Sequence, residues 1–366
     1  MGAFGIAALA GLLALLAYAA STWALFRRYR LDDGALERLE VELPTLGHHI
    51  ALSHHPAAER RYAEPLILCH GLGANRFNLD FCEDGRGRDR LSLARFLARA
   101  GFDVWVLETR GSGRAKVPKG AIYSADDQAQ EDVPTAIETV LHLTGAEQVI
   151  WVGHSWGGLL AYLFLGSDHP LVQKVKALVT VGSPGSVQHH QVPNFLLGIG
   201  RWLAKRGRAV PVTRYARLGL MPAPLLTWLA HRRFPKQATM RGRMFRHLCA
   251  SLAENINPGQ VRQMLLWRDR GEIVRMDGES YEARYPQLRQ PMLLLAAPID
   301  PLAPPDAVRS VRDRVGSKDV TFKVMSRAEG CTVDFGHGGL LVAEEAPDEV
   351  YPLIRDWLSA RAKQVV

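Results

Sequence analysis

The stretch VIWVGHSWGGLLAYLFLG, residues 149–166, constrains the fold of this chain more than any other part of the sequence. An apolar run of strand length ends at Gly153, Ser155 follows in a turn that contains Gly153 and Gly157, and an apolar run of helical length begins after Gly157. Glycines at 153 and 157 indicate a turn so tight that bulky neighbours would clash. The pattern predicts a strand–turn–helix unit that exposes the Ser155 hydroxyl in front of a helix N-terminus.

Short apolar runs alternate with helical patterns on both sides of this unit. Apolar strands that alternate with helices predict a parallel sheet covered on both faces. The alternation stops between residues 186 and 290, where helices alone are predicted and 18 Lys and Arg stand against 6 Asp and Glu, a surplus of 12. We therefore predict one α/β domain, residues 48–185 and 291–366, interrupted by a basic helical cap, residues 186–290.

The first 26 residues carry no charge and are followed at once by RRYR. About 20 apolar residues suffice for a helix to cross a bilayer, so residues 1–26 predict a transmembrane anchor. A cleaved signal peptide is the competing interpretation, although the start lacks the basic residues that such a peptide favours. Residues 27–47 are interpreted as a linker. The basic cluster on the C-terminal side of the helix favours a cytoplasmic catalytic domain by the positive-inside rule.

The stretch HHIALSHHP predicts a strand that ends at Pro56. Alternation along a strand places its four histidines on both faces, so we expect a solvated strand end here and no metal site. The sequence also lacks the spacing of a zinc site, a phosphate-binding loop and a dinucleotide fingerprint. A net charge of +8, spread along the chain, does not by itself indicate a nucleic-acid partner.

A serine hydroxyl becomes a useful nucleophile only beside a base. His337 is the candidate, because it lies between the last predicted strand and the last predicted helix with glycines on both sides. Asp300 ends the strand MLLLAAPID and is the candidate for orienting that base. Asp306, in the first turn of a helix, and Asp334, close to His337 in sequence, are the weaker candidates.

A tetrahedral intermediate at Ser155 would carry an oxyanion, which requires preorganised donors. We expect the backbone N–H of Trp156, directly after the nucleophile, to be one donor. The turn HGLGAN follows an early strand, and the N–H of Leu72 is the expected second donor. His70 is expected to brace that turn by hydrogen bonding.

These stretches resemble the α/β-hydrolase superfamily, and CHGLGANRFN, GFDVWVLETRGSG and GHSWGG resemble the branch around acid lipases and related bacterial esterases. The resemblance covers about half of the chain, residues 66–185 and the part after 291. It implies an eight-stranded, mostly parallel sheet with a cap above it, an acyl-serine intermediate, and neither a cofactor nor a metal. Dehalogenases and epoxide hydrolases of this superfamily carry Asp at the elbow, and polyester synthases carry Cys; here the residue is Ser155.

The sequence thus predicts a membrane-anchored serine carboxylester hydrolase, an esterase or lipase, acting on acyl or lipid-like esters. Its predicted partners are the ester substrate and a membrane that holds residues 1–26, and no nucleic acid. Two interpretations of the basic cap stay open: its basic and aromatic residues contact an anionic bilayer, or its aromatic residues pack inward and its arginines are solvated. An acyltransferase or thioesterase with the same three residues is the alternative. A catalytically silent binding protein is a further one, which three matching catalytic candidates argue against.

Overall fold

The computed structural model describes residues 3–31, 37–82, 89–188 and 194–365. Its centre is an eight-stranded sheet with the order β1-β2-β4-β3-β5-β6-β7-β8. β2 is antiparallel to both neighbours, and all pairings from β4 to β8 are parallel, which confirms the predicted fold class. The strands are β1 (Glu37–Glu42), β2 (His49–His55), β3 (Leu66–Cys69), β4 (Val104–Glu108), β5 (Val149–His154), β6 (Val175–Val181), β7 (Met292–Ala296) and β8 (Val320–Val324).

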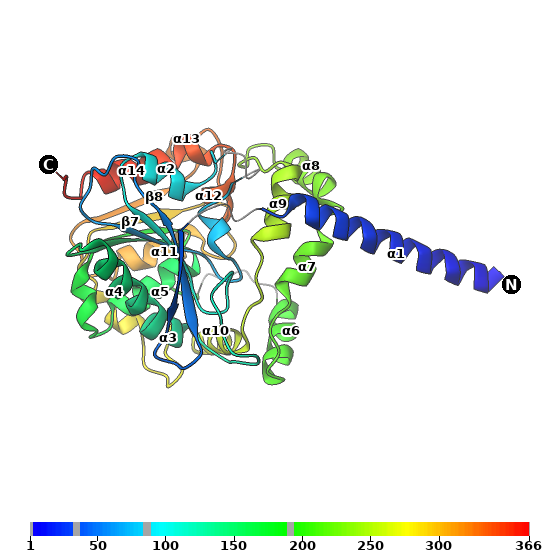
Figure 1. Ribbon diagram of the computed structural model, residues 1–366, viewed down its shortest axis with the longest axis horizontal. Helices are drawn as coiled ribbons and strands as arrows, with labels where there is room; N and C mark the ends of the chain where they lie inside the picture. Colours follow the sequence, from blue (N-terminus) through cyan, green and yellow to red (C-terminus); the bar gives the residue numbers. More distant parts are fainter. Residues whose placement is uncertain (1–2, 32–36, 83–88, 189–193, 366) are drawn as a thin grey trace.

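Helices cover both faces of the sheet. As a consequence, every residue of β3, β4, β5 and β7 is buried. One hydrophobic cluster joins a sheet face to α3 (Ala125–Asp127), α4 (Val133–Thr144), α5 (Trp156–Leu165) and α11 (Pro305–Arg312). The opposite face packs against α2 (Leu93–Arg99), α12 (Gly339–Val342), α13 (Ala346–Glu349) and α14 (Tyr351–Ser359). Figure 1 shows these two sets of helices on either side of the sheet. Because β3 to β8 are parallel, their carboxyl ends lie at the same edge of the sheet, and the turns that follow these strands lie close together there.

The described residues between β6 and β7 form five α-helices within the segment predicted as a cap: α6 (Asn194–Lys205), α7 (Val212–Leu218), α8 (Ala223–Arg233), α9 (Gly242–Ser251) and α10 (Pro258–Arg270). The described residues of that segment add no strand to the sheet. In Figure 1, α6 to α9 form a layer at one side of the molecule, and the C-terminus lies at the opposite side.

The N-terminal helix α1 (Ala3–Tyr29) projects from this layer, as Figure 1 shows. Its residues Leu9–Tyr29 are long and apolar enough to cross a membrane, and none of that window is buried in the protein. A signal sequence near an N-terminus would have the same length and composition. Among the residues whose side chains are described, contacts with the cap lie in the C-terminal half of the helix, for example where the Nδ1 of His247 on α9 lies 2.7 Å from the carbonyl oxygen of Tyr29.

The prediction that residues 27–47 are a linker is wrong in two places. α1 continues to Tyr29, and Glu37–Glu42 form β1, which pairs along its whole length with β2. The alternating charges of ERLEVE concealed the strand, because an edge strand can expose charged side chains and still pair on its other side.

The expectation of a solvated strand end at HHIALSHHP is also wrong, because β2 lies between β1 and β4. The His54 ring stacks on Trp105 at 4.0 Å between centroids, and its Nε2 lies 2.7 Å from Asp103 Oδ1. His55 is buried with its Nε2 3.4 Å from Asp80 Oδ2. Partner strands on both sides bury these histidines, which composition alone does not reveal.

Asp80 is a fully buried carboxylate that contacts β2 through His55, the segment at Arg76, and α2. Its oxygens accept hydrogen bonds from Arg76 (2.6 Å), from Ser92 (2.8 Å), which caps α2, and from Arg95 on α2 (3.1 Å). Burial alone would raise the pKa of Asp80, but the hydrogen bonds and charges of His55, Arg76 and Arg95 outweigh it and the pKa is lowered. The ionised carboxylate is therefore part of the folded structure.

We expect Asp80→Ala to lower the free energy of unfolding by about 3–5 kcal/mol, because it removes the buried carboxylate that bonds Arg76, Ser92 and Arg95. Urea unfolding at neutral pH measures this. Because the folded-state pKa is depressed, the difference from wild type should persist above about pH 4 and shrink in stronger acid. Asp168→Ala, which removes an exposed carboxylate, is the control and should change stability by less than about 0.5 kcal/mol. Equal losses in both variants would contradict the role given to Asp80.

Candidate active site

Ser155 lies on the turn between β5 and α5, as the sequence predicts, and its backbone is strained. With φ 50° and ψ −114°, it is the one non-glycine residue with a positive φ in the described part of the chain. A Cβ on Gly153 would lie 2.3 Å from the backbone nitrogen of Gly158, and one on Gly157 would lie 2.3 Å from the carbonyl oxygen of Cys69. The glycines are thus required by close packing of α5 against the strand ends, and this packing holds Ser155 in a conformation that L-residues rarely adopt.

Asp300 and His337 lie in contact, although 37 residues separate them. Asp300 follows β7 and His337 precedes α12, and Asp300 Oδ2 accepts a hydrogen bond of 2.6 Å from His337 Nδ1. The other carboxylate oxygen accepts from the backbone N–H groups of Leu302 (2.8 Å) and Ala303 (2.9 Å). Burial acts to raise the pKa of Asp300, but these hydrogen bonds and the charge of His337 lower it overall. An ionised Asp300 can only accept, so Nδ1 carries the proton and Nε2 remains available as a base.

The strand end at β6 brings this pair to the serine turn. The N–H of Ser155 donates to Val181 O at 2.9 Å, and the next residue is Gly182. A Cβ on Gly182 would lie 3.3 Å from Asp300 Oδ2 and 3.4 Å from His337 Nδ1. The three predicted catalytic residues therefore gather at the carboxyl edge of the sheet. Between described residues, no hydrogen bond joins Ser155 Oγ to the His337 ring, and such bonds commonly close only when substrate is bound.

The two predicted oxyanion donors belong to turns on either side of Ser155. Trp156 is the first residue of α5, where a backbone N–H has no acceptor within the helix. Leu72 follows Gly71, and a Cβ on Gly71 would lie 3.3 Å from Ser155 Cβ. Both predicted donors are thus on segments in contact with the serine turn, which is the placement that an oxyanion site requires.

Two buried side chains, His70 and Asn78, bond the turn that carries Leu72, and a third, His154, bonds Asn78. His70 Nδ1 donates to Gly71 O at 2.8 Å, and its Nε2 accepts from the N–H of Thr109 at 3.2 Å. Burial lowers the pKa of His70 to about 4, so its ring is neutral at physiological pH, and the expected bracing role is observed. Asn78 Oδ1 accepts both from Gly71 N (3.0 Å) and from His154 Nδ1 (2.8 Å).

Asn78 and His154 are site residues that the sequence analysis missed. The His154 ring lies 4.9 Å from the His337 ring between centroids, with Nε2 3.2 Å from His337 O. Burial, with the charge of His337, lowers the pKa of His154 to about 3. Within the GHSWG stretch, His154 occupies an unrestricted position of the pattern, so only its place beside Ser155 could have singled it out.

A third missed residue, Gln128, connects the site to the cap. Its Oε1 accepts from Trp156 Nε1 (2.9 Å) and from Gln260 Nε2 of α10 (2.9 Å), and its Nε2 donates to Thr109 Oγ1 (3.1 Å). Gln128 begins a π-helix, Gln128–Asp132, and Pro134 just beyond it has no N–H for regular helix bonding. This local widening places the Gln128 amide between the catalytic turn and the cap.

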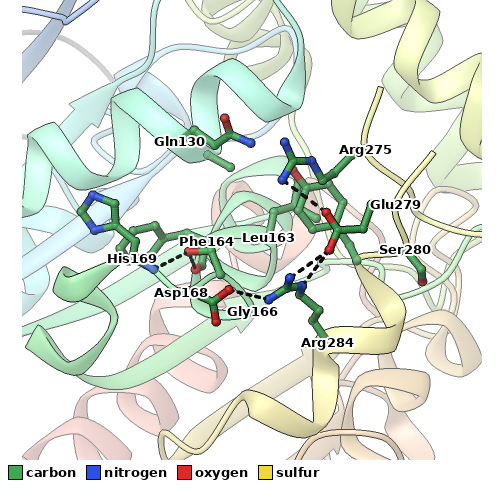
Figure 2. A pocket seen from close by; sticks show the side chains of 13 residues that line it. Gln130, Leu163, Phe164, Gly166, Asp168, His169, Arg275, Glu279, Ser280 and Arg284 are labelled. Atoms are coloured by element: carbon green, nitrogen blue, oxygen red, sulfur yellow. Dashed lines mark hydrogen bonds and ion pairs between the residues drawn. The ribbon is translucent and has the colours of Figure 1, made fainter. Parts of the chain in front are cut away.

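A pocket of about 370 Å³ lies at the opposite end of α5 from Ser155, beside Leu163 and Gly166. Figure 2 shows the Arg284 side chain in this pocket, bonded to both Glu279 and Asp168. The charges there are already paired, and the eight or more residues between Ser155 and the pocket correspond to about 12 Å of helix. We assign this pocket no part in the site.

We expect Gly157→Ala to abolish the site geometry, because the new methyl group would meet backbone atoms of Cys69 that cannot move independently. The free energy of unfolding should fall by at least about 1–3 kcal/mol, as measured by urea unfolding. Gly198→Ala on α6, where a Cβ meets nothing within 4 Å, is the control and should be neutral or stabilising. A folded, fully stable Gly157→Ala variant would refute the packing argument.

Comparison with known proteins agrees with the fold described above. A family model described as alpha/beta hydrolase fold matches residues 64–329. Human lysosomal acid lipase/cholesteryl ester hydrolase is 33% identical over 165 residues, which cover 42% of this chain and 40% of the relative. Gastric triacylglycerol lipase of Rattus norvegicus is 30% identical over 112 residues, 28% of either chain. The chain thus spans less than half the length of these curated relatives.

Solved structures with a similar fold align with most of this chain. The crystal structure of a membrane phospholipase A, described as a novel bacterial virulence factor, aligns with a TM-score of 0.57 at 19% identity and covers 98% of this chain and 96% of the other. Monoacylglycerol lipase of Paleococcus ferrophilus aligns with a TM-score of 0.54 at 18% identity, over 89% and 99% of the two chains. Such low identity shows the fold alone. Because the family model spans most of the sequence, the chain belongs to the alpha/beta hydrolase fold family.

Proposed function

We propose that this protein is a membrane-anchored serine carboxylester hydrolase that works through an acyl-serine intermediate. One observation carries the proposal: the Asp300–His337 hydrogen bond lies against Gly182, directly after the strand end that bonds the backbone of Ser155. A base with a fixed tautomer beside a strained, projecting serine is the arrangement that acyl transfer requires.

In the first half of the proposed reaction, Ser155 Oγ attacks the ester carbonyl carbon while His337 Nε2 takes the hydroxyl proton. Asp300 stabilises the imidazolium that forms. The N–H groups of Leu72 and Trp156 donate to the oxyanion of the tetrahedral intermediate. Collapse of this intermediate breaks the bond to the alkoxy oxygen, which leaves as the alcohol with the proton from His337, and the acyl group stays on Ser155.

In the second half, a water molecule attacks the acyl-serine carbonyl while His337 takes one of its protons. The same two backbone donors stabilise the second oxyanion. Its collapse returns the proton to Ser155 Oγ and releases the carboxylic acid. The sum is one ester and one water converted to one acid and one alcohol, with no other reactant.

Lipid-like acyl esters are the proposed substrate class. The names of the relatives describe an acid lipase/cholesteryl ester hydrolase and a triacylglycerol lipase, and α1 would hold the enzyme at a membrane where such esters reside. Arg27 and Arg28 end the apolar span. By the positive-inside rule, we propose that the catalytic domain faces the cytoplasm.

A fluorophosphonate probe tests the proposed nucleophile, because it labels only activated serines. Labelling should vanish in Ser155→Ala and fall sharply in His337→Ala. In Asp300→Asn, the amide can donate to Nδ1 and so favour the wrong tautomer of His337, and it carries no charge to stabilise the imidazolium. The kcat for ester hydrolysis should therefore fall by roughly 10⁴. Asp306→Asn, an exposed aspartate on α11, is the matched control and should keep full activity. Undiminished labelling of a folded Ser155→Ala protein would refute the assignment.

Esters graded by acyl length, presented in water and in vesicles, test the substrate class. We expect long-chain esters in vesicles to be hydrolysed with higher kcat/KM than short soluble esters, because the anchor brings the site to the lipid. Retention of the protein in membranes after an alkaline wash measures the anchor itself. Hydrolysis of short soluble esters only, with no gain on vesicles, would contradict the lipid-ester proposal.

A further inference from the structure

α8 is a helix without a buried face. Of its eleven residues, Ala223 alone is buried, and Leu225, Leu226, Trp228 and Leu229 are each about half exposed. These four positions are spaced i, i+1, i+3 and i+4, which places them on one side of a helix. An amphipathic helix normally packs such a stripe into the protein, and an isolated helix of this length is only marginally stable in water. We therefore expect another surface to cover these four apolar side chains.

The apolar surface continues into the end of α7. Leu218 ends that helix and Met221 lies in the turn before α8, and both side chains are exposed. We call Leu218, Met221, Leu225, Leu226, Trp228 and Leu229 the α7–α8 patch. Contiguous exposed apolar surface of this kind marks a contact with a protein or a membrane.

α1 fixes the position of this patch relative to a bilayer. The Tyr18 hydroxyl donates to the carbonyl oxygen of Leu218 at 2.8 Å, and the guanidinium of Arg217 lies 4.3 Å from the Phe26 ring. α8 packs closely against the start of α9. A Cβ on Gly242 would lie 2.6 Å from Pro224 Cα. The α7 end of the patch thus lies beside the C-terminal half of α1, and α8 packs next to α9 on the side of the molecule from which α1 projects in Figure 1.

The depth of Tyr18 in the proposed span decides what surrounds the patch. Tyr18 precedes Arg27 by nine residues, about 13 Å along a helix axis. The headgroup layer is only about 6 Å thick on each side of the hydrocarbon. With Arg27 among the headgroups, Tyr18 lies below the hydrocarbon boundary and brings Leu218 to the same depth. A carbonyl at a helix C-terminus is costly in hydrocarbon unless it accepts a hydrogen bond, which Tyr18 supplies.

The charges around the patch have the distribution that a membrane interface favours. His231, Arg232 and Arg233 end α8, and the Arg232 guanidinium lies 5.3 Å from the Trp228 ring. Tryptophan and arginine are the side chains that lie at headgroup level, where the arginine can reach an anionic headgroup. The surplus of 12 basic residues in residues 186–290 complements such headgroups.

We propose that the α7–α8 patch inserts into the leaflet through which α1 leaves the bilayer, with the basic end of α8 on anionic headgroups. The proposal rests on the proposed membrane anchor and adds a second, shallow point of insertion. Lipid is the occupant that the geometry favours over a second copy of the chain, because the patch adjoins the part of α1 that lipid itself surrounds.

Depth-dependent quenching tests the insertion in the full chain. A fluorophore on Leu226→Cys, in a Cys331→Ser background, is followed in vesicles of phosphatidylcholine and phosphatidylglycerol; the other three cysteines are buried. Leu143→Cys on α4, exposed to a similar extent, is the matched control. We expect doxyl-labelled lipid to quench the probe at 226 and aqueous iodide to quench the probe at 143. Equal iodide access at both positions would overturn the proposal.

Shielding at 226 that occurs without lipid quenching and grows with protein density would also overturn it, in favour of a second copy. Alkaline washing and fluorophosphonate labelling of the same samples separate the two proposals. A protein that washes off the vesicles defeats the anchor. A protein that stays and is labelled at Ser155, but exposes position 226 to iodide, defeats the α7–α8 insertion alone.

A kinetic measurement gives an independent check. Leu226→Ser should lower the ratio of the rate on vesicle ester to the rate on soluble ester by about tenfold, because transfer of one leucine out of lipid costs about that factor. Leu143→Ser should leave the ratio unchanged. An unaltered ratio in Leu226→Ser would contradict the insertion.

Discussion

The close approach of α5 to the end of β3 is the constraint on which the rest of the site depends. A Cβ at Gly157 would lie 2.3 Å from Cys69 O, so only a glycine lets the helix begin there. That position of α5 forces Ser155 into its φ of 50°. The same contact aligns the first amide of α5, at Trp156, with the turn that leaves β3 and carries Leu72. One packing contact thus sets the proposed nucleophile and both proposed oxyanion donors together.

The cap is joined to this site at one edge by direct hydrogen bonds. Glu254 N donates to Gly73 O at 2.8 Å, and Asn75 Nδ2 donates to Ser251 O at 2.7 Å. Ser251 Oγ in turn accepts from the N–H of Leu31, just past α1, at 2.7 Å. A continuous link therefore runs from the proposed anchor through the end of α9 to the turn that carries Leu72.

The sequence predicted the positions of the candidate catalytic residues best, because each of them lies next to a recognisable turn or strand end. The glycines around Ser155 exist because of backbone contacts, and Asp300 and His337 follow strands whose ends share one edge, so their positions could be read from local pattern. Whether they act as a catalytic triad remains a prediction.

What the sequence could not reveal depends on pairing and packing between distant segments. β1 looks like a charged connector, because only its pairing with β2 makes it a strand. Asn78 and Gln128 are ordinary polar residues in sequence, and their roles come from partners 76 and 132 positions away, His154 and Gln260. No local periodicity encodes such contacts, since each is decided by the tertiary fold.

A transmembrane helix alone is effectively irreversible as an anchor, so the α7–α8 patch would add little to membrane retention. Its physical effect would be on orientation. A domain held by one helix can tilt and rotate about it, whereas a second contact at α8 removes those freedoms. The hydrogen bond between Tyr18 and Leu218 and the ring contact between Tyr29 and His247, 5.1 Å between centroids, already hold the cap against α1 at two levels. With α8 in the leaflet as well, the cap side of the enzyme would face the lipid in a fixed orientation.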